Sequence, residues 1–199
     1  MNASADAYHH GSLRRSILDR LEQVIAERGA AGVTIRGLAT DVGVSHTAVG
    51  HHFGTRTGLL SAFAAEGFDL LSEALLRVRD EGEFLDLGIA YLRFALEHPA
   101  HFSVMFEPKL LDYDAHGLRE ASRRAFSLLQ SSSDDFGGDG ERESTAAILV
   151  AGWGMMHGIA QLALAGVFDE GTLREAMGNA DVIDLARRAG RLLEPPTAG

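Results

Sequence analysis

Apolar residues recur at helical spacing along most of the chain, and short breakers separate the runs. The first run ends at Gly29, which favours a C-terminal cap, and Thr34 and Ser45 are suitable N-caps for two short helices. A longer helix is predicted from about Arg56. The apolar anchors of these four helices are Leu13, Ile17, Leu21, Val24 and Ile25, then Ile35, Leu38, Ala39 and Val42, then Val44, Val49 and Phe53, then Leu59, Leu60, Phe63, Phe68, Leu71 and Leu75.

The helical pattern continues beyond residue 80. Two helical runs end near Pro99 and Pro108, and "SSSDDFGGDG" (131–140) has the composition of an exposed loop. Further helices are predicted at about 116–130, 141–166 and 180–193. No alternating strand pattern and no internal repeat occur, so the sequence predicts an all-α fold.

Charge is distributed unevenly over the 199 residues, whose net charge is −10. Residues 1–56 carry six arginines and five acidic residues, whereas the remainder carries 12 basic and 23 acidic residues. The asymmetry favours a small module at 8–56 attached to an acidic body at 57–199, although a short segment can also fluctuate by chance. The chain has no cysteine, which excludes disulfides, thiolate metal sites and cysteine nucleophiles.

Nothing in the sequence predicts a membrane segment. No uninterrupted run approaches the roughly 18 apolar residues of a membrane span, and the N-terminus lacks the apolar region of a signal peptide. We therefore expect a cytoplasmic protein with no membrane partner.

Two short helices joined by a glycine-containing turn and braced by a first helix describe a helix-turn-helix. In such a motif the second short helix lies in the DNA major groove, and its first residues meet the base edges. Val44, Val49 and Phe53 are predicted to face inward. The outward residues are then Ser45, His46, Thr47, Gly50 and His51.

The stretch "TIRGLATDVGVSHTAVGHHFGTRTGLLSAF" (34–63) resembles the DNA-binding domain of the TetR family of transcriptional regulators. In that family Gly-Val-Ser opens the recognition helix, His-Phe closes it, and a basic residue precedes a Leu-Leu pair. Residues 8–21 are also similar to the N-terminal arm and first helix of many members. The resemblance covers roughly residues 8–65.

The resemblance implies a set of DNA contacts. Thr34 and Arg36 would lie near a phosphate at the start of the second helix. The groove and adjacent phosphates would be met by Ser45, His46 and Thr47, and the DNA backbone would be approached by His51, His52 and Arg56.

Two of these residues keep a structural alternative: Ser45 as a cap alone, and His52 as packing beside Phe53. A metal site from His46, His51 and His52 is rejected, because positions 46 and 51 point apart on one helix and no carboxylate or thiolate completes the set.

Gly50 departs from the family, where a tyrosine that reaches a phosphate usually stands. Our hypothesis is that Gly50 lets the helix backbone approach DNA more closely or shifts recognition to His46 and His51. An unchanged sequence preference in a Gly50→Tyr variant would refute it. Gly37 also departs, because an acidic residue often stands there and would strengthen the Thr34 cap.

Residues 88–108 together with "WGMMHG" (153–158) are similar to the C-terminal domain of a TetR subgroup that carries Trp-x-x-x-His-Gly. For a ligand pocket we nominate Tyr91, Phe94, Phe102, Met105, Phe126, Trp153, Met156 and His157. Aromatic and methionine residues at helical spacing equally suit a plain core. A zinc site from His98, His101 and His157 is disfavoured, and no cofactor is predicted.

A stripe of small residues on the long helix would allow a second helix to approach closely: Ala147, Ala151, Gly154, Gly158 and Ala165. In the family the last two long helices typically form the dimer interface, which implies a homodimer through about 141–166 and 180–193. Such a dimer would hold two recognition helices about 34–36 Å apart, to match a palindromic double-stranded operator. The resemblance implies repression relieved by a small-molecule effector, whose identity the sequence does not specify.

Two other classes of protein are alternatives to a regulator. An enzyme is disfavoured, because "GWGMMHG" has neither a preceding strand nor dinucleotide-binding spacing, and no nucleophile elbow or carboxylate pair occurs. A helical binding protein that has lost DNA binding stays open, given Gly50 and the modest N-terminal charge. A gel shift with DNA flanking the gene separates it from a regulator.

Overall fold

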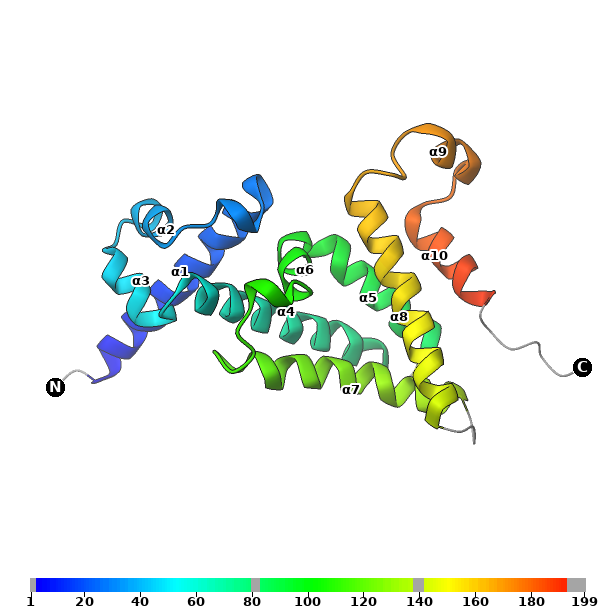
Figure 1. The fold of residues 1–199 in the computed structure, drawn as a ribbon, viewed down its shortest axis with the longest axis horizontal. Helices are drawn as coiled ribbons and strands as arrows, with labels where there is room; N and C mark the ends of the chain where they lie inside the picture. Colours follow the sequence, from blue (N-terminus) through cyan, green and yellow to red (C-terminus); the bar gives the residue numbers. More distant parts are fainter. Residues whose placement is uncertain (1–2, 80–82, 138–141, 193–199) are drawn as a thin grey trace, which may run out of the picture. The chain divides into compact units, whose positions relative to one another are not determined.

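A computed structural model describes residues 3–79, 83–137 and 142–192, with side chains described at 12–79, 83–131 and 146–192 (Figure 1). These residues form helices connected by turns and contain no strand, so the all-α prediction is confirmed. The α-helices are α1 (Ala3–Arg28), α2 (Ile35–Val42), α3 (His46–Phe53), α4 (Arg56–Arg79), α5 (Phe84–Glu97), α6 (Pro99–Met105), α7 (Leu118–Gly137), α8 (Arg142–Leu164), α9 (Gly171–Met177) and α10 (Val182–Arg191). Two short 3₁₀ helices lie at Ala30–Gly32 and Pro108–Leu110.

The chain divides into two compact units that each combine separate stretches of sequence. The first unit contains residues 1–68 and 99–121, and the second contains residues 69–98 and 122–199. Helices α4 and α7 therefore contribute residues to both units. In the first unit α2 and α3 pack on α1, and in the second unit α5, α8 and α10 pack on one another.

One predicted detail of the helices is wrong, because α7 extends through Gly137 into the segment predicted as a loop. At the other end of the chain, α1 begins at Ala3. Serine and aspartate cost less than about 0.7 kcal/mol each in a helix, so a helix that is already formed propagates through them. Residues 138–140 of that segment lie outside the described residues.

Helix α8 is more apolar than its uninterrupted runs suggest. Averaged over a window within Ala146–Leu164, its mean hydropathy is 1.5, which is enough by length and composition alone to cross a membrane. A count of consecutive apolar residues does not detect this high mean hydropathy, because glycine, histidine and glutamine interrupt the apolar runs. One such helix is weak evidence for a membrane span, and only 11% of the window is buried within the chain, so α8 carries an exposed apolar surface.

The start of α4 packs tightly against the end of α3. A Cβ added at Gly58, which is buried, would overlap the backbone carbonyl oxygen of Phe53. By contrast, a Cβ added at Gly50 in the middle of α3 would meet no atom within 4 Å. A side chain is therefore excluded by packing at Gly58 but not at Gly50.

We expect Gly58→Ala to lower the free energy of unfolding by about 1–3 kcal/mol, because the backbone of Phe53 must move. Gly50→Ala is the matched control and should raise it by about 0.5–1 kcal/mol through helix propensity alone. Urea denaturation followed by circular dichroism measures both. Equal effects of the two substitutions would contradict the tight α3–α4 junction.

Candidate functional site

The turn between α2 and α3 has the geometry of a tight helix-turn-helix junction. Gly43 ends α2 in the left-handed region (φ 75°, ψ 31°), which glycine adopts without strain, and Val44 N–H donates to the carbonyl of Ala39 at 2.9 Å. The predicted caps are confirmed, since the hydroxyls of Thr34 and Ser45 each accept a backbone N–H bond at 3.1 Å. Both short helices are thus fixed at their starts.

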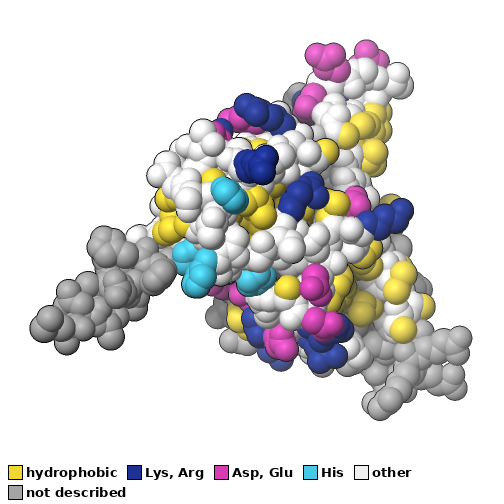
Figure 2. Space-filling model, turned by 60° about the vertical axis from the view of Figure 1, so that its left-hand side comes forward, with side chains coloured by type: hydrophobic (Ala, Val, Ile, Leu, Met, Phe, Trp, Pro, Cys, Tyr) yellow, Lys and Arg dark blue, Asp and Glu magenta, His cyan; other side chains and the backbone are white. Residues whose placement is uncertain are grey.

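Helix α3 divides into a buried and an exposed face as predicted. Val49 and Phe53 are buried and Val44 is half-buried, whereas Gly50 and His52 are half-buried at the edge. The exposed residues are Ser45, His46, Thr47 and His51. Thr34 and Arg36 are also exposed at the start of α2. We call the N-cap Ser45 and the α3 residues His46, Thr47 and His51, together with Thr34 and Arg36, the α2–α3 surface. Figure 2 shows histidine, lysine and arginine side chains at the molecular surface.

Phe53 anchors the end of α3 within the first unit. The Arg14 guanidinium lies 5.5 Å from the centroid of the Phe53 ring, within the range of a cation–π contact. The His116 ring lies 5.9 Å away, and its Nε2 donates to the Phe53 carbonyl at 3.4 Å. His52 also lies beside this ring, at 6.2 Å between centroids. Sequence reasoning missed Arg14 and His116, because neither has helical spacing relative to Phe53.

Arg56 is half-buried and braces the domain from inside. Its Nε donates to the carbonyl of Val33 at 2.9 Å, and its Nη2 donates to the carbonyl of Ala30 at 2.5 Å. These bonds join the start of α4 to the connection between α1 and α2. The DNA role predicted for Arg56 stays a prediction beside this structural role.

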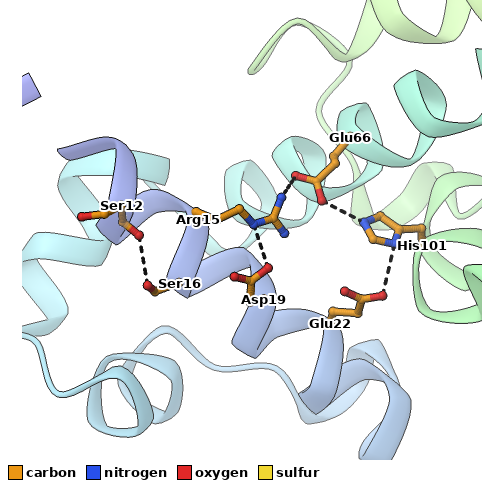
Figure 3. A network of polar contacts seen from close by, with 7 residues as sticks. All are labelled: Ser12, Arg15, Ser16, Asp19, Glu22, Glu66 and His101. Atoms are coloured by element: carbon orange, nitrogen blue, oxygen red, sulfur yellow. Dashed lines mark hydrogen bonds and ion pairs between the residues drawn. The ribbon is translucent and has the colours of Figure 1, made fainter. Parts of the chain in front are cut away.

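A chain of polar contacts connects α1 with α4 and α6 in the first unit (Figure 3). Arg15 donates to Asp19 on its own helix and to Glu66 of α4, both at 2.7 Å. On the other side of Glu66, Nε2 of His101 donates to its second carboxylate oxygen at 3.3 Å. His101 Nδ1 lies 3.8 Å from a carboxylate oxygen of Glu22, so α1 is held at two points.

His101 is buried and its ring stacks on Phe63, with centroids 3.8 Å apart and planes at 19°. Burial raises the pKa of Glu66, but hydrogen bonds from His101 and Arg15 and the charge of Arg15 outweigh burial, so the net pKa is below its usual value. Glu66 is therefore the carboxylate through which the three helices are joined.

The second unit contains a cavity of about 140 Å³ between α5, α8 and residues from α7 and α10. It is lined by Phe84, Leu85, Gly88, Tyr91, Leu129, Ile148, Leu149, Ala151, Gly152, Trp153, Met155, Met156 and Gly190. The three glycines allow close helix packing: a Cβ at Gly152 would meet Phe84 at 2.7 Å, and one at Gly88 would meet Met156 at 3.2 Å. A Cβ at Gly190 would overlap Leu85. Sequence reasoning missed this signal, because the glycines come from three helices.

Three of the nominated ligand residues meet in a hydrogen-bonded group. The Trp153 indole N–H donates to the Tyr91 hydroxyl at 3.1 Å, and that hydroxyl lies 2.8 Å from Nδ1 of His157. Burial raises the pKa of Tyr91, and the bond from Trp153 offsets this only in part. Burial lowers the pKa of His157. Both side chains are consequently uncharged at neutral pH.

The eight nominated ligand residues do not form one group. Tyr91, Trp153 and Met156 line the cavity. His157 is bonded to Tyr91, and Phe126 packs edge-on against Trp153 at 5.5 Å. Phe94 is buried in α5, whereas Phe102 and Met105 belong to the first unit.

The exposed side of α8 carries the predicted stripe of small residues. Ala147, Ala151, Gly154 and Ala165 are exposed, and Gly158 is half-buried. No atom lies within 4 Å of a Cβ built at Gly154 or Gly158, so this side is open. Larger apolar side chains beside it are also exposed: Val150 at 63%, Leu162 at 44% and Leu164 at 39%.

Family models match both parts of the chain. The model described as "Bacterial regulatory proteins, tetR family" matches residues 17–63, and "Tetracyclin repressor-like, C-terminal domain" matches residues 84–185. No curated protein is significantly similar to the chain.

Solved structures show the same fold. A protein of unknown function from Rhodococcus sp. RHA1 is 34% identical, with 94% of this chain and 98% of that chain covered and a TM-score of 0.69. The putative regulatory protein SCO4313 is 20% identical, with 95% and 98% covered and a TM-score of 0.74. The TetR family transcriptional regulator PfmR from Thermus thermophilus is 16% identical, with 92% and 99% covered and a TM-score of 0.59. At the last two identities the likeness concerns the fold alone.

The contacts of Glu66 predict a pH-dependent contribution to stability. We expect Glu66→Gln to lower the free energy of unfolding at pH 7 by about 1–3 kcal/mol, the contribution of hydrogen bonds to a charged group. Because the folded pKa of Glu66 is lowered, this difference is fully present above the unfolded pKa of about 4.3 and is lost as the pH falls through the folded value. Urea denaturation at pH 7, 5, 4 and 3 measures it.

Glu73→Gln is the matched control on the same helix, since Glu73 is exposed and forms an exposed ion pair with Arg77 at 3.7 Å. Its effect should stay below about 0.5 kcal/mol at every pH. An equal loss in both variants would show that Glu66 does not join the helices.

Proposed function

Since the chain belongs to the TetR family of bacterial regulatory proteins, we propose that it is a repressor that binds a palindromic operator as a homodimer and is released by a small-molecule effector. Members of this family are DNA-binding transcriptional regulators and not enzymes. We propose residues 8–56 as the DNA-binding domain and residues 57–199 as the effector-binding and dimerisation domain. The protein would act in the cytoplasm, where its DNA is.

The observation that carries the DNA-binding proposal is the exposed start of α3. Ser45, His46 and Thr47 are exposed directly after the tight turn at Gly43, while Val49 buries the opposite face. Side chains at the start of a helix in the second position of a helix-turn-helix meet base edges in the major groove. In this proposal His46 and Thr47 read base edges.

The flanking residues would position the helix on the DNA backbone. Arg36 and the N–H groups at the start of α2 suit a phosphate. His51, five residues after His46, is exposed on a different side of α3 and would approach the DNA backbone there. The open space around Gly50 supports the hypothesis of close backbone approach, because no atom of the residues that the structure describes would meet a Cβ at this position within 4 Å. His52 and Arg56 would contribute mainly by holding the helix in place.

The exposed side of α8 supports a homodimer. Its small residues permit close approach of a second helix, and the surrounding exposed leucines and valine would lose contact with water on association. We propose that residues 141–166 and 180–193 of two copies form the interface. This proposal accounts for an apolar helix that the chain itself leaves largely unburied.

We expect the His46→Ala/Thr47→Ala double variant to lose sequence selectivity. Its binding free energy for the operator should weaken by about 1–3 kcal/mol per lost base contact, whereas its affinity for scrambled DNA should change little. Arg36→Ala should weaken binding to both DNAs and reduce the salt slope by about 1. Fluorescence anisotropy with DNA flanking the gene, over a range of salt concentrations, measures these effects.

Arg119→Ala is the control for this experiment. Arg119 is exposed and pairs with Asp114 outside the α2–α3 surface, so its removal should leave DNA affinity unchanged. If the wild-type protein binds no DNA selectively at low salt, the alternative of a helical binding protein without DNA binding is correct.

For the dimer, we expect Gly154→Arg to raise the dissociation constant at least about tenfold, a change of about 1.4 kcal/mol. A long charged side chain would separate two helices that pack through small residues. Gly154→Ala keeps a small side chain and should preserve the dimer. Sedimentation velocity over a concentration series measures both, and an undisturbed dimer in Gly154→Arg would exclude this face from the interface.

A further inference from the structure

The cavity of the second unit has an unusually uniform lining. Apart from Tyr91 and Trp153, the residues that line it carry aliphatic, methionine or phenylalanine side chains or are glycine or alanine. No charged side chain occurs among the described residues of the lining. Such a wall offers a ligand apolar contacts and no ion partner.

The polar atoms of the wall are already bonded within the protein. The Trp153 N–H is donated to the Tyr91 hydroxyl, which in turn meets Nδ1 of His157. Burial raises the pKa of Tyr91 and lowers the pKa of His157, so in both side chains it favours the uncharged form. A carboxylate or ammonium group entering the cavity would lose its hydration without gaining an opposite charge, which is costly.

The volume limits the size of the ligand. A cavity of about 150 Å³ lined by aliphatic and aromatic side chains holds a molecule the size of benzene. The cavity here is about 140 Å³ and is partly open, so a single ring with a short substituent fits. The part of a larger ligand that exceeds this volume would extend through the opening.

We propose that the cavity binds an uncharged, mainly apolar molecule of about the size of one substituted aromatic ring and discriminates against anionic and cationic analogues. If the proposed function is correct, such a molecule is the class of effector that the regulator detects, and this consequence rests on that function. Selectivity between analogues follows from charge alone and requires no DNA.

Trp153 provides a direct measurement, because it is the only tryptophan of the chain and lines the cavity. Titration of the full-length protein at pH 7.5 with benzyl alcohol, benzoate and benzylamine compares one ring with three charge states. We expect benzyl alcohol to change the Trp153 fluorescence and to bind at least about tenfold more tightly than either ion. Equal or tighter binding of benzoate or benzylamine would overturn the inference, and so would the failure of all three to bind.

A cavity-filling variant locates the binding. Gly88 lines the cavity and neighbours the flexible Met156 side chain, so Gly88→Leu should lower the affinity for benzyl alcohol about tenfold or more. Arg93→Leu, an exposed position on the same helix, should leave it unchanged. Circular dichroism verifies folding, and Gly88→Ala provides a milder variant if Gly88→Leu does not fold. Unchanged affinity in the folded Gly88 variant would also overturn the inference.

DNA anisotropy with and without benzyl alcohol separates the two proposals. If benzyl alcohol binds selectively at Trp153 but DNA affinity is unchanged, the proposed ligand class is correct and the proposed release of DNA by such an effector is wrong. If benzoate releases DNA and benzyl alcohol does not, the proposed effector-controlled DNA binding is correct and the proposed uncharged ligand class is wrong.

Discussion

The orientation of α3 depends on the burial of one aromatic ring, that of Phe53. Complete burial of such a side chain stabilises the fold by about 1.5–3 kcal/mol, and a guanidinium from Arg14 and an imidazole from His116 lie against the ring. Gly58 allows the next helix to start directly behind its carbonyl group. Because Val49 lies one turn earlier on the same face, fixing Phe53 leaves the opposite face of α3 exposed. The surface proposed to meet DNA is thus determined by packing on the far side of the helix.

In the second unit, two properties determine which ligands the cavity can bind. The described residues that line it carry no charged side chain, and the helices around it pack closely. Gly88, Gly152 and Gly190 bring three helices together, and the remaining, partly open space is lined mainly by apolar side chains. The hydrogen bonds between Trp153, Tyr91 and His157 satisfy the polar atoms locally. The same helix α8 also carries the exposed stripe of small residues, and Ala151 belongs both to the stripe and to the cavity lining. One helix thus provides both a cavity wall and an open apolar surface.

Features that depend on nearby residues could be predicted from the sequence, and features that depend on distant partners could not. The caps at Thr34 and Ser45 follow from side chains that bond a backbone N–H three residues away. The acceptors of Arg56 are carbonyls 23 and 26 residues earlier, which no local pattern reveals. Periodicity indicates apolar aromatic residues but not the unit to which each belongs, so Phe102 of the first unit is nominated together with residues of the second unit. The helical continuation of α7 was missed because composition is a weak guide where a helix is already formed.

The first unit is assembled from two separate stretches of chain, and this has an evolutionary consequence. His101 and His116, which lie against Phe63 and Phe53, come from the later stretch, residues 99–121. A cut after residue 68 would leave both rings without these neighbours and would remove one end of the Glu66 contacts. Residues 1–68 moved alone to another protein would therefore lose contacts that complete the first unit. Recombination that preserves these contacts has to carry residues 99–121 as well, so the two stretches of the first unit are expected to be inherited together.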